Sequence, residues 1–75
     1  MAKKDKSADS VYKITEVIGT SSTSWEEAAK NAVETASSTL RDLRVAEIVK
    51  LDVKVENGRV AAYRTRVALS FKYES

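Results

Sequence analysis

Few residues of this 75-residue chain are of types that could do chemistry. A single tryptophan, Trp25, follows the polar loop Gly19 to Ser24, and Glu47, Arg64 and Arg66 stand in later segments. The chain has no cysteine and no histidine, so an enzyme of this sequence would have to work with Ser, Lys, Tyr or carboxylates alone. We therefore expect a protein that is not an enzyme.

Trp25 is either a ligand platform or a structural peg that fixes the start of a helix. Ser24 and Glu27 have the S-x-x-E spacing of a capping box, in which each side chain bonds an unpaired backbone N–H. This spacing makes Ser24 the predicted N-cap and Trp25 the first helical residue, which favours the peg. The loop "GTSSTS" could hold an anion at the helix N-terminus, but helix capping is the favoured explanation of its hydroxyl groups.

The two arginines and Glu47 also allow two interpretations each. Arg64 and Arg66 share a strand face and either contact an anion, such as a cofactor phosphate, or form ion pairs with Asp52, Glu47 or a neighbouring subunit. We favour the ion pairs. Glu47 interrupts an otherwise apolar row, so it accepts a hydrogen bond from a partner or ligand, or contributes to a site for a hard cation such as calcium or magnesium.

A small α+β domain must position these residues. Val11 to Ile18 is rich in β-branched residues and predicts a strand that stops at Gly19. From Trp25, a helix of roughly 17 residues is predicted by helical spacing. The residues on its small apolar face are Ala28, Ala29, Ala32, Ala36, Leu40 and Leu43. Period-two alternation then predicts strands over residues 45–56 and 59–73, which gives a β-α-β-β order with a three-stranded antiparallel sheet curved over one helix.

The pairing of the last two strands depends on the turn between them. In the predicted alternation, Glu47 shares a face with Val45 and with the apolar residues up to Val55. With a two-residue turn at Asn57 and Gly58, the apolar residues of the two strands would lie on opposite faces of the sheet. We therefore predict a three-residue loop, 56–58, with Gly58 in the left-handed conformation and Val55 opposite Arg59.

The small size of the chain indicates a self-associating protein. A chain this short buries only about 60% of its unfolded surface, and it lacks disulfides or a zinc cluster to compensate, so oligomerisation is expected.

No apolar run reaches the roughly 20 residues needed to cross a bilayer, and no signal peptide is evident, so we expect a cytoplasmic protein with no membrane partner. With a net charge of only +2, nucleic acid is not an expected partner. Residues 1–9 are predicted to be a disordered tail or an expression remnant, and residues 10–75 the domain.

Three segments together resemble the dodecins, small β-α-β-β proteins that assemble into hollow spheres of twelve subunits. These segments are "VYKITEVIGTS", "SWEEAAKNAVETASSTLRDLRVAEIV" and "YRTRVALSFKYE", and the resemblance runs from Val11 to Glu74. It implies a hollow homododecamer with its sheets facing inward. It also implies binding of a flavin, FMN or riboflavin, between subunits against a tryptophan of a W-x-E pattern and a glutamine.

This chain departs from that pattern twice. Val45 stands where the family has its stacking tryptophan, and Arg64 stands where it has the glutamine, whereas Glu47 is retained. The resemblance therefore places the ligand site at Val45, Ala46, Glu47, Arg64 and Arg66. Structural roles fall to Ser24, Trp25, Glu27 and Gly58, and no residues are assigned to a metal. Two functions stay open: a non-catalytic shell that binds or buffers a flavin-type ligand, and a shell without a flavin site that serves as a structural or calcium- or magnesium-binding assembly.

Overall fold

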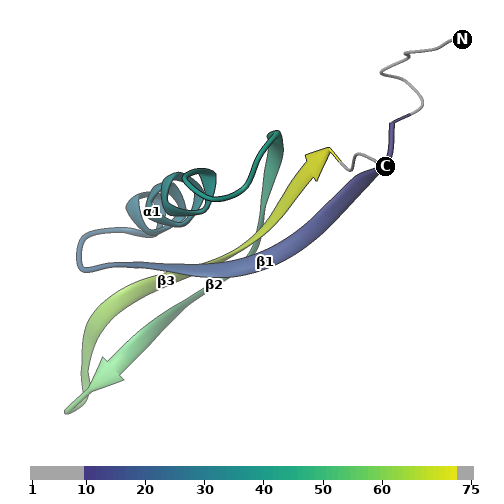
Figure 1. Ribbon diagram of the computed structural model, residues 1–75. Helices are drawn as coiled ribbons and strands as arrows, with labels where there is room; N and C mark the ends of the chain where they lie inside the picture. Colours follow the sequence, from purple (N-terminus) through teal and green to yellow (C-terminus); the bar gives the residue numbers. More distant parts are fainter. Residues whose placement is uncertain (1–9, 73–75) are drawn as a thin grey trace, which may run out of the picture.

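The computed structural model describes residues 10–72, and its element order confirms the predicted β-α-β-β topology. Strand β1 (Tyr12–Ser21) leads into helix α1 (Trp25–Ser37), which is followed by β2 (Leu43–Glu56) and β3 (Arg59–Lys72). The helix lies on one face of the sheet, and the β2–β3 hairpin projects beyond it (Figure 1). The tail predicted for residues 1–9 lies outside the described residues.

The sheet has the order β1-β3-β2, and both strand pairs are antiparallel. Because side chains alternate along a strand, the central strand β3 defines two faces. The helix face carries Thr65, Val67 and Leu69, and the outer face carries Arg66 and Ala68 with their neighbours in register. All candidate residues can be placed relative to these two faces.

The core between helix and sheet is small and depends on close approach. It is formed mainly by Ala32 of α1 with Val67 and Leu69 of β3. Strand β1 runs through Gly19, so the prediction that it stops there was wrong. A Cβ atom at Gly19 would collide with the backbone carbonyl oxygen of Ala28, which shows that the glycine lets the helix lie directly on the strand.

The helix is shorter than predicted, with 13 residues in place of roughly 17. Just after its end, the Ser38 hydroxyl donates to the Thr35 carbonyl (2.6 Å) and the Thr39 hydroxyl donates to the Ala36 carbonyl (3.2 Å). These bonds add to the backbone N–H bonds that the same two carbonyls accept from Ser38, Thr39 and Leu40. Leu43, which we assigned to the helix, belongs to β2.

The hairpin turn also differs from the prediction. Asn57 and Gly58 form a two-residue turn with φ values of 53° and 74°, typical of a type I′ hairpin. Gly58 has the predicted left-handed conformation, but Val55 lies opposite Val60 in place of Arg59. A register shift at Lys54/Val55 leaves Ala61 as the extra residue, and this bulge resolves the conflict between apolar faces that led us to reject the two-residue turn.

A second register shift in β2 reverses the faces that we predicted for residues 45–48, whereas Lys50 and Asp52 lie on the face of Arg64 and Arg66 as predicted. Between Ile48 and Lys50 the pairing skips Val49, so residues on either side of it no longer follow simple alternation. Glu47 therefore shares the outer face with Lys50 and Asp52. The prediction that Glu47 interrupts an apolar row was wrong.

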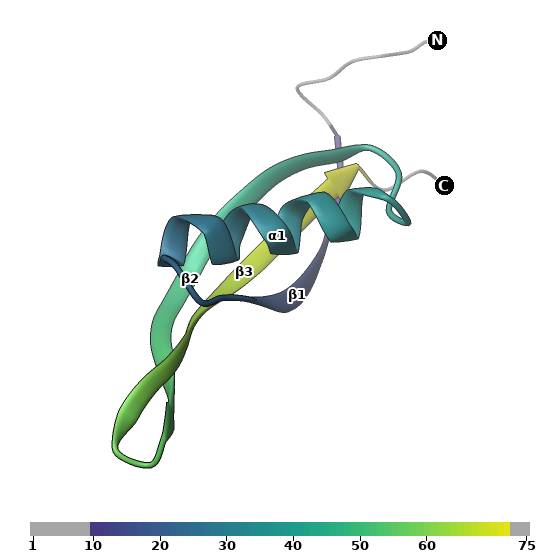
Figure 2. The same cartoon turned by 90° about the vertical axis from the view of Figure 1, so that its left-hand side faces the viewer.

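The helix leaves much apolar surface uncovered. It packs on β1 and β3 and has few contacts with β2 (Figure 2). Large apolar residues remain exposed just before β1, on all three strands and at the helix start: Val11, Tyr12, Ile14, Ile18, Trp25, Val45, Ile48, Val49, Leu51, Val55 and Val60. Such an extent of exposed apolar surface is typical of a chain that buries it against partners. Within residues 10–72, no helix is long and apolar enough to cross a membrane.

Candidate functional site

The outer face of the sheet brings the charged candidates together in rows that run across the three strands. Each row has one residue from β1, one from β3 and one from β2. The rows are Glu16–Ala68–Glu47, Ile18–Arg66–Lys50 and Thr20–Arg64–Asp52. The site is therefore an open, mixed-charge surface rather than an enclosed cleft.

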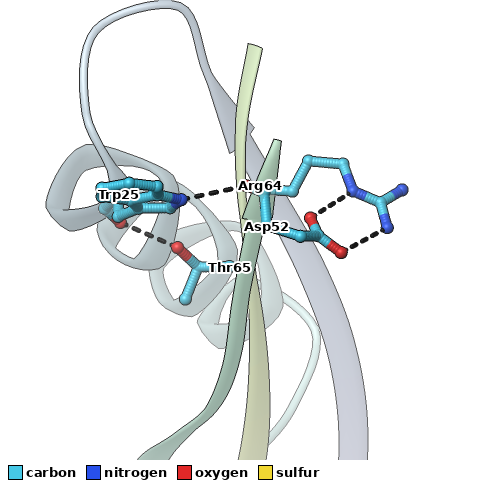
Figure 3. Close-up of polar contacts among 4 residues, drawn as sticks. All are labelled: Trp25, Asp52, Arg64 and Thr65. Carbon is cyan, nitrogen blue, oxygen red and sulfur yellow. Dashed lines mark hydrogen bonds and ion pairs between the residues drawn. The ribbon is translucent and has the colours of Figure 1, made fainter. Parts of the chain in front are cut away.

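Arg64 forms a bidentate ion pair with Asp52 on this face (Figure 3). Its Nε donates to Asp52 Oδ1 (2.7 Å) and its Nη2 donates to Oδ2 (2.9 Å). The hydrogen bonds from Arg64 lower the pKa of Asp52, and the charges of Arg66 and Lys50 act in the same direction. The pair in turn raises the pKa of Arg64. Of the two interpretations of Arg64, the structure shows the ion pair.

Trp25 lies on the opposite side of the sheet from this ion pair (Figure 3). Its indole Nε1 donates to the backbone carbonyl of Asp52 (2.9 Å), and its own carbonyl accepts from the Thr65 hydroxyl (2.9 Å). The indole also meets the Tyr63 ring edge-on, with ring centres 5.1 Å apart. These contacts tie the first residue of α1 to both β2 and β3, which is the arrangement of a structural peg.

The loop before the helix uses its hydroxyl groups for capping. Ser24 is the N-cap, and its Oγ accepts from the backbone N–H of Glu27 (3.0 Å), as predicted. The second half of the predicted capping box was wrong, because the Glu27 carboxylate accepts from the Ser21 hydroxyl (2.7 Å) in place of the Ser24 N–H. Ser21 Oγ accepts from the N–H groups of Thr23 and Ser24. Hydrogen bonds from Ser21 and Thr23 lower the pKa of Glu27.

Glu16 and Glu47 are the carboxylates of the outer face that stand apart from the bidentate pair. Both are exposed, and in register they flank Ala68 of the central strand, which is itself buried. Carboxylate oxygens are ligands for hard cations such as Ca²⁺. Within residues 10–72, no group of three or more acidic side chains is placed to hold a metal ion. A cation bound by this carboxylate pair would therefore need ligands from water or from another copy of the chain.

The residues that the resemblance assigned to a ligand do not all share one surface. Val45 lies on the outer face opposite Ser70, whereas Ala46 lies opposite Leu69 on the helix face. Sequence reasoning missed Glu16, although its place between Ile14 and Ile18 on a predicted strand put it on the same side as both. It was not recognised because the bulge that brings Glu47 onto that side leaves no clear signal in the sequence.

The fold is that of a small α+β protein in which one helix covers one face of a three-stranded antiparallel sheet and leaves the other face exposed. The chain belongs to the dodecin family, because the family model "Dodecin" matches residues 11–74. Calcium dodecin of Mycobacterium tuberculosis is 44% identical over 63 residues, which cover 84% of this chain and 89% of that protein.

Two solved structures show the same fold. Dodecin from Streptomyces coelicolor has a TM-score of 0.82 and 37% identity, covering 91% of this chain and 97% of that one. The calcium dodecin crystal structure from Mycobacterium tuberculosis has a TM-score of 0.77 and 43% identity, covering 87% and 93%. That protein is described as a calcium-chelating antigen with a novel calcium-binding site.

Proposed function

We propose that this protein is a non-catalytic, homododecameric shell that binds calcium through carboxylates of the outer sheet face. The observation that carries this proposal is the pair of exposed carboxylates, Glu16 and Glu47, on either side of Ala68. Support comes from the relative named calcium dodecin, which shares 44% of its residues with this chain over the matched segment.

Assembly accounts for the surface that the single chain leaves bare. The buried apolar residues are few and mostly small, whereas eleven large apolar residues are exposed. A chain of this size gains little stability from such a core, so association with further copies supplies the missing burial. The same association brings carboxylates from different copies together, as a calcium ion with six to eight oxygen ligands requires.

Calcium suits this site better than magnesium. Ca²⁺ accepts flexible coordination geometry, whereas Mg²⁺ demands a near-ideal octahedron and retains several waters. Ligands contributed by separate strands, and by separate chains, meet the looser requirement more readily. We therefore assign magnesium a weaker affinity for the same carboxylates.

A flavin-type ligand, FMN or riboflavin, is the second candidate, because Glu47 of the W-x-E pattern does lie on the outer face. Two features weigh against it. Val45 offers no aromatic ring, and stacking on such a ring is worth roughly 0.5 to 1.5 kcal/mol beyond area burial. Arg64, at the glutamine position, already directs its Nε and Nη2 to Asp52.

Equilibrium dialysis with radioactive calcium tests the proposal. We expect saturable binding by the wild type and at least about tenfold weaker binding by Glu16→Gln/Glu47→Gln, because each carboxylate removed takes away a charged ligand. Glu26→Gln/Glu34→Gln changes the charge equally on exposed helix positions and should bind as the wild type does. Equal calcium binding by both double variants would show that the carboxylates flanking Ala68 are not the ligands.

A further inference from the structure

We propose that Lys50 and Arg66 form a second site on the outer face, for the phosphate group of a small anionic molecule. This site is distinct from the proposed calcium ligands and does not depend on how many chains assemble. Three features of the structure support it: the pairing of two cations, the lack of a carboxylate to neutralise them, and an adjacent apolar side chain.

The first feature is the direct pairing of like charges. The bulge at Val49 brings Lys50 opposite Arg66, and both side chains are exposed. Residues directly opposite in an antiparallel pair have Cβ atoms about 5 Å apart, and like charges at such positions destabilise the sheet. An arrangement with this cost is explained if an anion binds between the two cations.

The second feature is that no carboxylate of residues 10–72 forms an ion pair with Lys50 or Arg66. Asp52, next along the outer face, has both oxygens bonded to Arg64. The ion pairs among residues 10–72 join Arg44 with Asp42, Lys54 with Glu56, and Arg64 with Asp52; none includes Lys50 or Arg66. Glu16 and Glu47 occupy the adjacent row and make no ion pair with either cation within 4.0 Å. The rows of Arg66 and Arg64 together hold three cations and one carboxylate, an excess of two positive charges within those two rows.

The third feature indicates the class of ligand. A phosphate monoester carries up to two negative charges and three acceptor oxygens, so it can accept a forked pair of bonds from a guanidinium and a further bond from an ammonium group. On the other side of Arg66 lies Ile18, which is 44% exposed. Its side chain offers an apolar surface to the organic part of the ligand. The geometry therefore fits a small phosphate monoester better than inorganic phosphate.

Phosphorus NMR on the assembled protein in calcium-free buffer tests this site, with inorganic phosphate and phenyl phosphate as probes. Binding to a large particle broadens the phosphorus signal, so a titration of linewidth gives an apparent Kd. We expect wild-type protein to bind phenyl phosphate more tightly than inorganic phosphate. Lys50→Gln/Arg66→Gln should weaken both by at least about tenfold, because two charged donors are lost. The affinities of Lys50→Gln alone should lie between those of the wild type and those of the double variant.

Lys13→Gln/Lys30→Gln removes the same formal charge from other exposed positions and is the matched control. It should leave both affinities within about twofold of the wild type, since exposed charges far from the ligand are screened by salt. Equal broadening with both double variants, or none with the wild type, would overturn the proposal. It would also be overturned if Lys50→Gln/Arg66→Gln changed the number of chains in the assembly while phosphate binding stayed the same, because the cations would then pair with a carboxylate of another copy. Since calcium is absent from these samples, none of these results depends on the calcium-binding proposal.

Discussion

Replacing Trp25 with phenylalanine tests whether this residue is a structural peg. The substitution removes the hydrogen bond from Nε1 to the Asp52 carbonyl (2.9 Å) and keeps a ring that can still meet Tyr63. A hydrogen bond of this kind contributes about 0.5 to 1.5 kcal/mol net. Part of the aromatic contact, itself worth about 0.5 to 1.5 kcal/mol, is lost as well because the phenyl ring is smaller than indole. We therefore expect a loss of about 1 to 2 kcal/mol in the free energy of unfolding.

Urea unfolding followed by far-ultraviolet circular dichroism measures this loss. Chain concentration must be equal in all samples, because association shifts the apparent stability of an oligomer. Tyr12→Phe is the matched control, since Tyr12 is an exposed aromatic residue of the outer face and also loses one polar group. Its unfolding midpoint should stay close to that of the wild type.

Two results would refute the assignment of Trp25 as a peg. One is an unfolding free energy that changes no more in Trp25→Phe than in Tyr12→Phe. The other is unchanged stability together with lost calcium or flavin binding, which would make the indole a ligand platform. Because Trp25 lies on the opposite side of the sheet from Arg64 and its ion pair with Asp52, we expect ligand binding on the outer face to persist in this variant.

Three further predictions follow from the same contacts. Asp52 and Glu27 have folded-state pKa values below their ordinary values of 3.8 and 4.5, so the unfolded chain binds more protons than the folded chain in this pH range. The stability that these two carboxylates contribute is therefore present above about pH 4.5 and is lost as the pH falls through the lowered pKa values. Urea midpoints between pH 6 and pH 2.5 should therefore fall less steeply for Asp52→Asn than for the wild type, and parallel curves would contradict this. Gly19→Ala should destabilise the fold by about 1 to 3 kcal/mol or prevent folding, because the new Cβ meets the helix backbone. Gly58→Ala is the control: its Cβ has open space but a φ of 74°, so it should cost only about 1 kcal/mol. Equal urea midpoints for the two variants would count against the close packing at residue 19. Val45→Trp should raise FMN affinity about tenfold or more in a fluorescence titration if the rest of a flavin pocket is intact, at 1.4 kcal/mol per decade, whereas unchanged binding would show that the pocket itself has diverged.

The element order and the helix cap could be predicted from sequence because both depend on local patterns. The β-branched run, the small-residue helical spacing and the two alternating segments each carry their own signal. Ser24 caps the helix through a bond to a residue three positions away, so the spacing alone identifies it. The left-handed conformation of Gly58 is equally local.

The features that sequence reasoning missed depend on contacts between elements. Gly19 resembles a strand terminator until the helix is placed against it, and only then does the close approach explain the residue. The bulges at Val49 and Ala61 adjust the strands to the sheet's curvature and are not encoded by alternation. Because the face of Glu47 depends on the bulge at Val49, its pairing across Ala68 with Glu16 could not be read from the sequence.

The site was therefore only partly predictable. Asp52 was named among several partners for Arg64, but the register that joins these two residues required the structure. The direct pairing of Lys50 with Arg66 also required the structure, because it depends on the bulge at Val49. Residue types indicated which chemistry was available, and the bulge decided which charges meet.

Native mass spectrometry most directly tests the central claim of a calcium-binding shell. Protein purified without added ligand should give a homododecamer whose mass rises by bound calcium ions when calcium is added and returns after chelation, with no flavin-sized increment. The Glu16→Gln/Glu47→Gln variant should show the same chain count with fewer calcium ions. A dodecamer that retains flavin and does not take up calcium, or a chain that stays monomeric, would contradict the account.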